Sequence, residues 1–437
     1  MAADMRTESA VTSPPPEGLA LLVSRLLGSV AEELSSVAGE ADVAGLAGRI
    51  RRAASLLDWI RARLDTDQAT EEALADQVSR LAAADADSDS LASSIYRLLQ
   101  ARQRADRPGP APVSTVPGDK PVSPADVTTY LRARRPGSDD VAHEVRAITG
   151  GFSKRTLLVT ATLDGARQDI VLRQVPAGRR ARSLGPEFRV VQAVHAAGLP
   201  VPEPLWIEPG DNILGGAFFV TRRAQGDNVG DVWGADRASK EICLDMASVY
   251  ARLHQLETAG LAAPVSPRGT PEELHEMISW QESTLAKRGI RTDPVLQALL
   301  GWLRGHVPEA PGRRSLIHGD AAFSNLLVQD ATITAVLDWE AAHIGNPAEE
   351  LAYLRPSIEP ILPWEDFLQR YIASGGTAPD PAAMRFFDVW SHVWRHIGCL
   401  WLAQNYDATG RYASAVAAYV HGPRFLAQAV TAAFGPA

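Results

Sequence analysis

The N-terminal part of the chain carries apolar side chains at intervals of three and four residues, which is the spacing of amphipathic helices. Such runs occupy residues 19–34, 43–64 and 74–99. Helices of this kind are stable when they bury their apolar stripes against one another. We therefore predict an all-α helical domain at residues 1–107. No cluster of His, Cys or paired carboxylates shares one face of these runs, so we expect the domain to contact a protein partner rather than to catalyse a reaction.

A proline-rich segment follows, with six prolines between Pro108 and Pro124. Proline has no amide hydrogen and is excluded from helix interiors and central strands. The composition favours an extended chain, so we predict a linker at residues 108–124.

The rest of the chain changes from strand-like to helical patterning. A short helix is expected after Ser123, which is a good N-cap. Alternating apolar and polar residues then predict strands, with one helix among them. The strands are expected at 144–148, 157–162, 169–173, 205–208 and 217–221, and the helix at 186–197. From residue 239 the pattern is mostly helical, interrupted by strands at 315–317, 325–328 and 332–337. The prediction is an α+β domain at 125–437, with a small β-rich lobe at about 125–225 and a large helical lobe at about 226–437.

Composition narrows the possible functions. The 437 residues include 43 Lys and Arg against 52 Asp and Glu, a formal charge of −9, which argues against a surface built for nucleic acid. The two cysteines, Cys243 and Cys399, have no paired spacing that would indicate disulfides or a zinc module. No apolar run reaches the length of a membrane span, and residues 1–18 lack the apolar core of a signal peptide. We expect a cytoplasmic protein with no membrane contact.

The segment that carries chemistry begins at His318 and includes Asp320 and Asn325. Asp338 follows, thirteen residues after Asn325, at the end of a predicted strand. Phosphoryl transfer needs a carboxylate that orients the attacking hydroxyl and accepts its proton, and oxygen ligands that hold Mg²⁺ against the phosphates. The spacing from Asp320 to Asn325 is that of the kinase catalytic loop H-R-D-x-x-x-x-N. We therefore predict that Asp320 is catalytic and that Asn325 and Asp338 bind the metal.

Two other interpretations of this segment exist. An isolated His-Gly-Asp sequence is compatible with a tight turn in which Asp320 binds backbone amides. A metal hydrolase that uses His318, Asp320, Asp338 and His343 is also compatible with the residue types. The first does not account for the spacing to Asn325 and Asp338, and the second does not account for the upstream glycine turn or for Arg173.

The His318–Asn325 segment, followed by Asp338-Trp339-Glu340, resembles the hallmark of the aminoglycoside phosphotransferase and choline-kinase-like family of small-molecule kinases. The resemblance covers about residues 125–420. It implies a bilobal protein-kinase-like fold, ATP and Mg²⁺ as cofactors, and a small hydroxylated molecule as acceptor.

The same resemblance implies which residues contact the nucleotide. Arg173 stands where kinases usually have a lysine, with Glu187 on the next helix as its expected partner. Arginine remains charged and can hold phosphate oxygens with two donors. Asn346 and Glu350 stand where the family commonly has aspartate, and we expect them to support the site rather than to bind metal. The residues expected to bind the cofactor are Gly150, Gly151, Ser153, Arg173, Glu187, Thr221 and Arg222.

A finer likeness concerns the acceptor. Residues 171–178 and 199–204 resemble the kinase-like domains found fused to, or encoded beside, acyl-CoA dehydrogenases, which implies a hydroxyacyl substrate. Residues 356–437 contain six acidic residues and five arginines, so they offer no strongly acidic well for a polycationic antibiotic. The alternatives are an aminoglycoside or macrolide antibiotic phosphotransferase and a non-catalytic kinase-like binding module.

Overall fold

A short capped helix opens the part of the chain that the structure describes. This computed structural model describes residues 122–435 except 149–153, 176–183, 211, 231–236, 291–293, 310–312 and 410–411, so the predicted helical domain at 1–107 and the linker up to residue 121 lie outside it. Helix α4 spans Pro124–Arg134. The Ser123 hydroxyl accepts from the Asp126 amide, and the Asp126 carboxylate accepts from the Ser123 amide. The predicted cap at Ser123 is confirmed.

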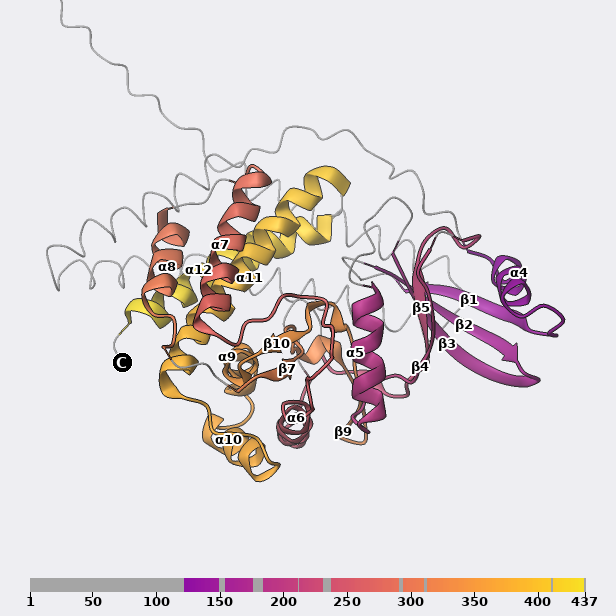
Figure 1. Ribbon diagram of the computed structural model, residues 1–437, viewed down its shortest axis with the longest axis horizontal. Coiled ribbons are helices and arrows are strands. Elements are labelled where there is room, and N and C mark those ends of the chain that lie inside the picture. Colours follow the sequence, from indigo (N-terminus) through magenta and orange to yellow (C-terminus); the bar gives the residue numbers. More distant parts are fainter. Residues whose placement is uncertain are drawn as a thin grey trace, which may run out of the picture. The chain divides into compact units, whose positions relative to one another are not determined.

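Five antiparallel strands form the sheet of the first lobe, in the order β1-β2-β3-β5-β4 (Figure 1). Among the residues that the structure describes between these strands, one helix is present, α5 at Leu184–Ala196, after β3. The predicted strands and helix are all present, with ends shifted by a few residues. The strands are β1 (Val141–Ile148), β2 (Arg155–Leu163), β3 (Ala166–Gln174), β4 (Pro204–Glu208) and β5 (Phe218–Arg222).

The alternation along β2 builds one core of this lobe. Leu157, Val159 and Ala161 are buried on one face of the strand. They pack in one cluster with Phe218 of β5 and with Tyr130 of α4, whose ring meets the Phe218 ring edge-on at a centroid distance of 5.1 Å. Because side chains alternate along a strand, the apolar residues of β2 gather on one face of the sheet. Helix α4 covers this face and removes it from water.

The second lobe is mainly helical, as predicted. Helix α6 packs against α10 and against strand β9 (Thr332–Val336), and α9 packs against α11. Trp390 of α11 is almost fully buried, while Trp394 and Trp401 on the same stripe are half-buried. The helices are α6 (Lys240–Leu253), α7 (Pro271–Lys287), α8 (Pro294–Gly305), α9 (Pro347–Ile358), α10 (Trp364–Ala373), α11 (Pro381–Thr409) and α12 (Tyr412–Phe434).

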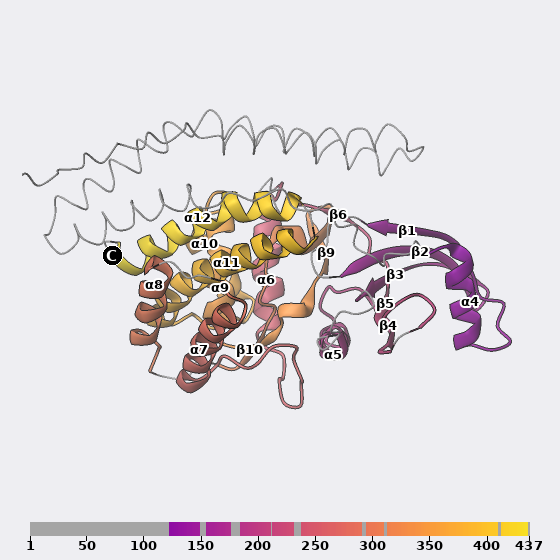
Figure 2. The same cartoon turned by 90° about the horizontal axis from the view of Figure 1, so that it is seen from above.

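Short strands and turns of this lobe carry the two predicted catalytic segments, and Figure 2 shows β9 and β10 with the helices of the lobe. Strand β7 pairs with β10, and β8 pairs with both β6 and β9. One predicted catalytic segment follows β7 and the other follows β9. The elements are β6 (Asp227–Asn228), β7 (Ser315–Ile317), β8 (Leu326–Gln329), β9 (Thr332–Val336), β10 (His343–Gly345) and the 3₁₀ turns η1 (Phe323–Asn325) and η2 (Trp339–Ala341). Strands β6 and β10 were not predicted, since two or three residues carry no periodicity.

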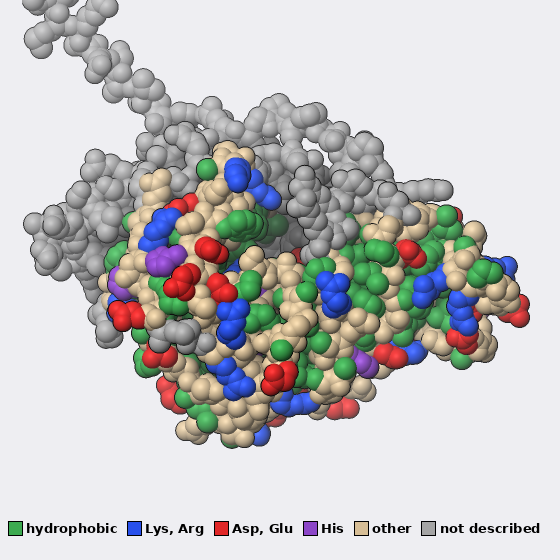
Figure 3. All heavy atoms as spheres, in the orientation of Figure 1, with side chains coloured by type: hydrophobic (Ala, Val, Ile, Leu, Met, Phe, Trp, Pro, Cys, Tyr) green, Lys and Arg blue, Asp and Glu red, His purple; other side chains and the backbone are tan. Residues whose placement is uncertain are grey.

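Acidic and basic side chains are mixed over the described residues on the face shown in Figure 3. Among the described helices, none has both the length and the apolar character needed to cross a membrane.

Candidate active site

A tight turn after β7 presents Asp320. Gly319 has a φ of +81°, and a Cβ at this position would lie 2.5 Å from the carbonyl oxygen of Ala341. Only glycine satisfies both conditions, because the left-handed backbone and the close approach each exclude a side chain. The predicted His-Gly-Asp segment is thus a turn that brings two backbone segments into contact.

Two buried side chains hold this turn. Both oxygens of the Glu350 carboxylate, from α9, accept backbone hydrogen bonds, from the His318 amide at 2.6 Å and the Gly319 amide at 3.1 Å. The His318 Nδ1 atom accepts from the Asp320 amide at 3.2 Å, which leaves Nε2 to donate to the carbonyl of Leu337 at 2.9 Å. Glu350 and His318 therefore order the turn, and His318 also ties it to the segment that carries Asp338.

The Asp320 carboxylate is held on both sides. The Tyr353 hydroxyl donates to Oδ1 at 2.8 Å, and the Asn325 side-chain amide donates to Oδ2 at 3.0 Å. Burial raises the pKa of Asp320, although His318 and the Tyr353 hydrogen bond act in the opposite direction. Burial and the neighbouring Asp320 raise the pKa of Tyr353, so its hydroxyl keeps the proton that it donates. The sequence did not reveal Tyr353, which lies three residues beyond Glu350 and so on the same face of α9.

Asp338, the other predicted metal ligand, lies two residues after the end of β9. Its backbone is left-handed, with a φ of 67°, a conformation that few non-glycine residues adopt and that recurs at functional sites. Its Oδ1 atom is 2.5 Å from Nη2 of Arg173, on β3, and both side chains are partly exposed. The guanidinium of Arg173, from the first lobe, thus contacts Asp338, which the sequence predicts to bind the metal.

Asn325 and Asp338 fit a Mg²⁺ site in the chemistry of their donors. Mg²⁺ prefers oxygen ligands and commonly binds one or two protein groups together with phosphates and water. The amide nitrogen of Asn325 is engaged with Asp320, so its oxygen is the atom for a cation. Arg173 already pairs a positive charge with Asp338. Among the described residues, no group of three or more His, Cys, Asp or Glu side chains could hold a metal.

The predicted pairing of Arg173 with Glu187 is wrong. Glu187, on α5, lies 2.7 Å from the Lys154 ammonium group instead. Lys154 also lies 2.5 Å from Glu340, which is two residues beyond Asp338. Lys154 thus holds the buried glutamate, and the Arg173 guanidinium pairs with Asp338. A sequence signal existed, since Lys154 is one of only four lysines in the chain and directly follows the predicted phosphate-binding turn.

The structure does not test the other residues that we expect to bind the cofactor. Gly150, Gly151 and Ser153 lie outside the described residues. Thr221 is buried within β5. Arg222 is exposed and its guanidinium donates to Glu203 at 2.6 Å and to Gln168 at 2.9 Å. Nucleotide contacts at these positions stay predictions.

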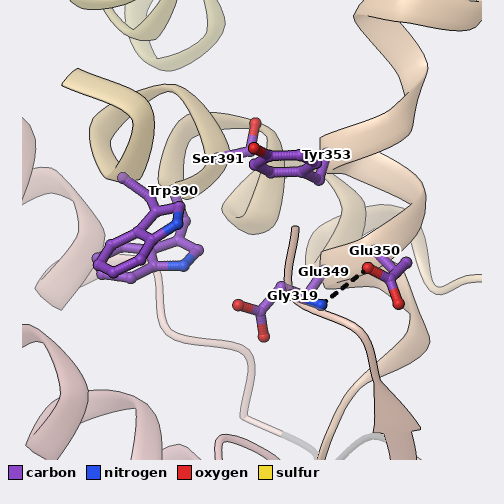
Figure 4. Close-up of a pocket in the computed structure, with 7 residues that line it drawn as sticks. Gly319, Glu349, Glu350, Tyr353, Trp390 and Ser391 are labelled. Carbon is purple, nitrogen blue, oxygen red and sulfur yellow. Dashed lines mark hydrogen bonds between the residues drawn. The ribbon is translucent and has the colours of Figure 1, made fainter. Parts of the chain in front are cut away.

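A small cavity adjoins the Asp320 turn (Figure 4). The rings of Trp390 and Trp394 are stacked, with centroids 6.2 Å apart, and form an aromatic wall. Tyr353, which contacts Asp320, lies on the cavity lining as well. The lining consists of Gly319, Glu349, Glu350, Tyr353, Trp390, Ser391 and Trp394.

Both carboxylates of this lining are already paired. Glu350 accepts the two backbone hydrogen bonds of the turn. Glu349 accepts from Arg268 at 2.7 Å and lies 2.8 Å from Nε2 of His343. Burial would raise the pKa of Glu349, but His343 and Arg268 outweigh it and lower this pKa to about 2. The cavity is therefore aromatic, and the two acidic groups of its described lining are compensated.

The metal-hydrolase interpretation finds no support in this geometry. His318 is bonded to the backbone and His343 to Glu349 and to the Ala341 carbonyl, so neither imidazole is directed with Asp320 and Asp338 toward a common point. The arrangement instead offers a restrained carboxylate beside a cavity and a second carboxylate that faces a guanidinium.

Comparison with known proteins gives three findings. Residues 144–387 match a family described as the phosphotransferase enzyme family. Acyl-CoA dehydrogenase family member 11 of Rattus norvegicus is 28% identical over 238 residues, which are 52% of this chain and 30% of that protein. Hygromycin-B 4-O-kinase of Escherichia coli is 26% identical over 173 residues, which are 36% of this chain and 48% of that protein. The chain thus spans less than half the length of each of these relatives.

One crystal structure shows the same fold. A protein of Ralstonia eutropha, described provisionally as an aminoglycoside phosphotransferase, superposes with a TM-score of 0.54 and 19% identity, over 70% of this chain and 96% of that one. The superposition shows that the described part of this chain shares its fold with that protein.

We predict that Gly319→Ala destabilises the protein. The new Cβ would meet the Ala341 carbonyl oxygen and strain a left-handed backbone, so the free energy of unfolding should fall by about 2 kcal/mol. Gly301→Ala is the matched control, because nothing lies within 4 Å of a Cβ there and the residue is in helix α8. Denaturant unfolding measures both variants. Equal stability of Gly319→Ala and the wild type would contradict the tight turn.

The Glu349 pairing predicts a pH-dependent contribution to stability. A fall in this pKa from 4.5 to about 2 corresponds to roughly 3 kcal/mol. Because the folded pKa is lowered, this stability is present above the unfolded pKa and is lost as pH falls toward 2. Denaturant unfolding of Glu349→Gln should therefore show a large deficit at pH 7 that shrinks between about pH 4.5 and 2. A deficit that does not change with pH would refute the pairing.

Proposed function

Because the chain belongs to the phosphotransferase enzyme family, we propose that it transfers the terminal phosphoryl group of ATP to a hydroxyl group of a small molecule. The observation that supports this most strongly is the restraint of Asp320 beside the cavity. Two hydrogen bonds, from Tyr353 and Asn325, fix its carboxylate. A binding module has no need of a carboxylate fixed in this way.

In the proposed reaction Asp320 is the catalytic residue. Its carboxylate orients the acceptor hydroxyl and takes the hydroxyl proton as the oxygen forms its bond to phosphorus. The bond between that phosphorus and the β–γ bridging oxygen breaks, and ADP leaves. Most of the acceleration would come from positioning and charge neutralisation.

The nucleotide would bind on the side of Arg173 and Asp338. Asn325 and Asp338 would hold Mg²⁺, which neutralises phosphate charge when bound. Arg173 would hold phosphate oxygens with its guanidinium, which can make two parallel hydrogen bonds. Gly150, Gly151 and Ser153 would contact the phosphates, and the end of β5 at Thr221 and Arg222 would meet the base.

The cavity favours an acceptor that is partly apolar and not polycationic. The aromatic side chains of its lining are Tyr353, Trp390 and Trp394, and Glu349 and Glu350 are already paired. A polycationic acceptor needs unpaired carboxylates, because burying an amine without a counter-charge is unfavourable. We propose a hydroxyacyl compound. The relative named for acyl-CoA dehydrogenase supports this choice, and the hygromycin-B kinase supports the antibiotic alternative.

We further propose that the protein acts in the cytoplasm, without nucleic acid or membrane, and that residues 1–107 contact a protein partner.

The activity is tested with the purified full chain, ATP and Mg²⁺, and a panel of hydroxyacyl-CoAs, free hydroxy acids, aminoglycosides and macrolides, with products detected by mass. We expect phosphorylated hydroxyacyl products. Asp320→Ala should lower kcat at least about 100-fold while ADP still binds. If only aminoglycosides or macrolides are phosphorylated, the acceptor is an antibiotic and the proposed hydroxyacyl acceptor is wrong.

Asp366→Ala is the matched control for the charge, because Asp366 is exposed in the first turn of α10. Wild-type turnover in Asp320→Ala would refute the catalytic assignment. Failure of the wild-type chain to bind any nucleotide would refute the proposed function.

A further inference from the structure

Lys154 is a buried cation that the proposed reaction does not use. Its side chain is 3% exposed, and its ammonium group lies 2.7 Å from Glu187 and 2.5 Å from Glu340. A lysine is rarely buried unless acidic groups compensate its charge. Burial would lower the pKa of Lys154, but the two glutamates outweigh this effect and raise it, so the group stays charged.

The register of the sheet places Lys154 beside Arg173. Thr156 of β2 is paired with Arg173 of β3, so their side chains share a face. Lys154 directly precedes the first residue of β2, Arg155, and lies two positions before Thr156. Lys154 and Arg173 thus come from adjacent segments of the chain, and each reaches a different carboxylate of the second lobe, Glu340 and Asp338 respectively.

The partners of these cations flank one buried side chain. Asp338, the partner of Arg173, and Glu340, a partner of Lys154, stand on either side of Trp339, which is 3% exposed. The Trp339 ring packs edge-on against His318 at a centroid distance of 4.6 Å. Lys154 is thus linked to the turn that carries Asp320 through a continuous set of contacts.

We propose that Lys154 is a positioning residue that joins Glu187 of α5 to Glu340 of the second lobe and thereby reserves Arg173 for Asp338 and the nucleotide phosphates. In this chain the two carboxylates are held by different cations, since Lys154 contacts Glu187 and Arg173 contacts Asp338. Dividing the task between Lys154 and Arg173 fixes α5, strand β3 and the Asp338–Glu340 segment relative to one another. The inference rests on the proposed phosphotransferase function.

The test measures ADP affinity in Mg²⁺, by calorimetry on the full chain, and kcat with whichever acceptor reacts. Lys154→Met should weaken ADP binding about tenfold and lower kcat about 100-fold, because the contact that joins α5 to the Asp338–Glu340 segment is lost. Lys154→Arg should recover part of both losses. Lys287→Met is the matched control, since Lys287 is exposed at the end of α7.

A double variant separates positioning from charge compensation. Lys154→Met alone leaves Glu187 buried without a partner and is expected to lower the Tm. Lys154→Met with Glu187→Leu removes both buried charges and should restore the Tm, but neither ADP affinity nor kcat. Glu340→Gln keeps the buried pair and should lower kcat about tenfold.

The outcomes distinguish this inference from the proposed function. Wild-type ADP affinity and turnover in the double variant would overturn the role of Lys154 while leaving the phosphotransferase intact. If no acceptor reacts with the wild type, ADP affinity alone decides the role of Lys154. If the wild type binds no nucleotide, the proposed function fails and the inference falls with it.

Discussion

The site depends on two ion pairs that connect the strand-rich lobe to the carboxylates around Trp339. Arg173 reaches Asp338 at 2.5 Å, and Lys154 reaches Glu340 at the same distance while it also contacts the buried Glu187. Lys154 and Glu187 are almost fully buried, and buried charges are tolerated only when they are paired, whereas Arg173, Asp338 and Glu340 are partly exposed. The ion pairs fix where the sheet meets the Asp338–Glu340 segment, and the packing of Trp339 on His318 extends that constraint to the turn of Asp320.

Paired carboxylates also determine the character of the cavity. Glu350 is used for the backbone of the turn, and Glu349 is held between Arg268 and His343. The wall that remains for an acceptor is aromatic, from Trp390 and Trp394. Glu349 and Glu350, the two acidic residues of the described lining, are therefore bonded to other groups of the protein and are not free to pair with a cationic acceptor. This is the physical basis for proposing an apolar, hydroxylated acceptor.

Much of this organisation could be predicted from the sequence. Strands and long helices have a recognisable periodicity of apolar residues, and the spacing of Asp320, Asn325 and Asp338 is specific. What could not be predicted is which cation meets which carboxylate. Lys154 and Arg173 lie nineteen positions apart in the sequence and become neighbours only through the register of β2 and β3. Tyr353 was missed because a tyrosine on a helix is ordinarily core, and only the packing of α9 directs its hydroxyl to Asp320.

The central claim is that Asn325 and Asp338 form a metal-assisted phosphate site. It is tested most directly by calorimetric titration of the full chain with ADP, with and without Mg²⁺, for the wild type and for Asp338→Asn. The account predicts that Mg²⁺ strengthens ADP binding at least about tenfold in the wild type and adds little in the variant, because the carboxylate supplies the charge that the cation needs. Equal ADP affinity with and without Mg²⁺ in the wild type would contradict it.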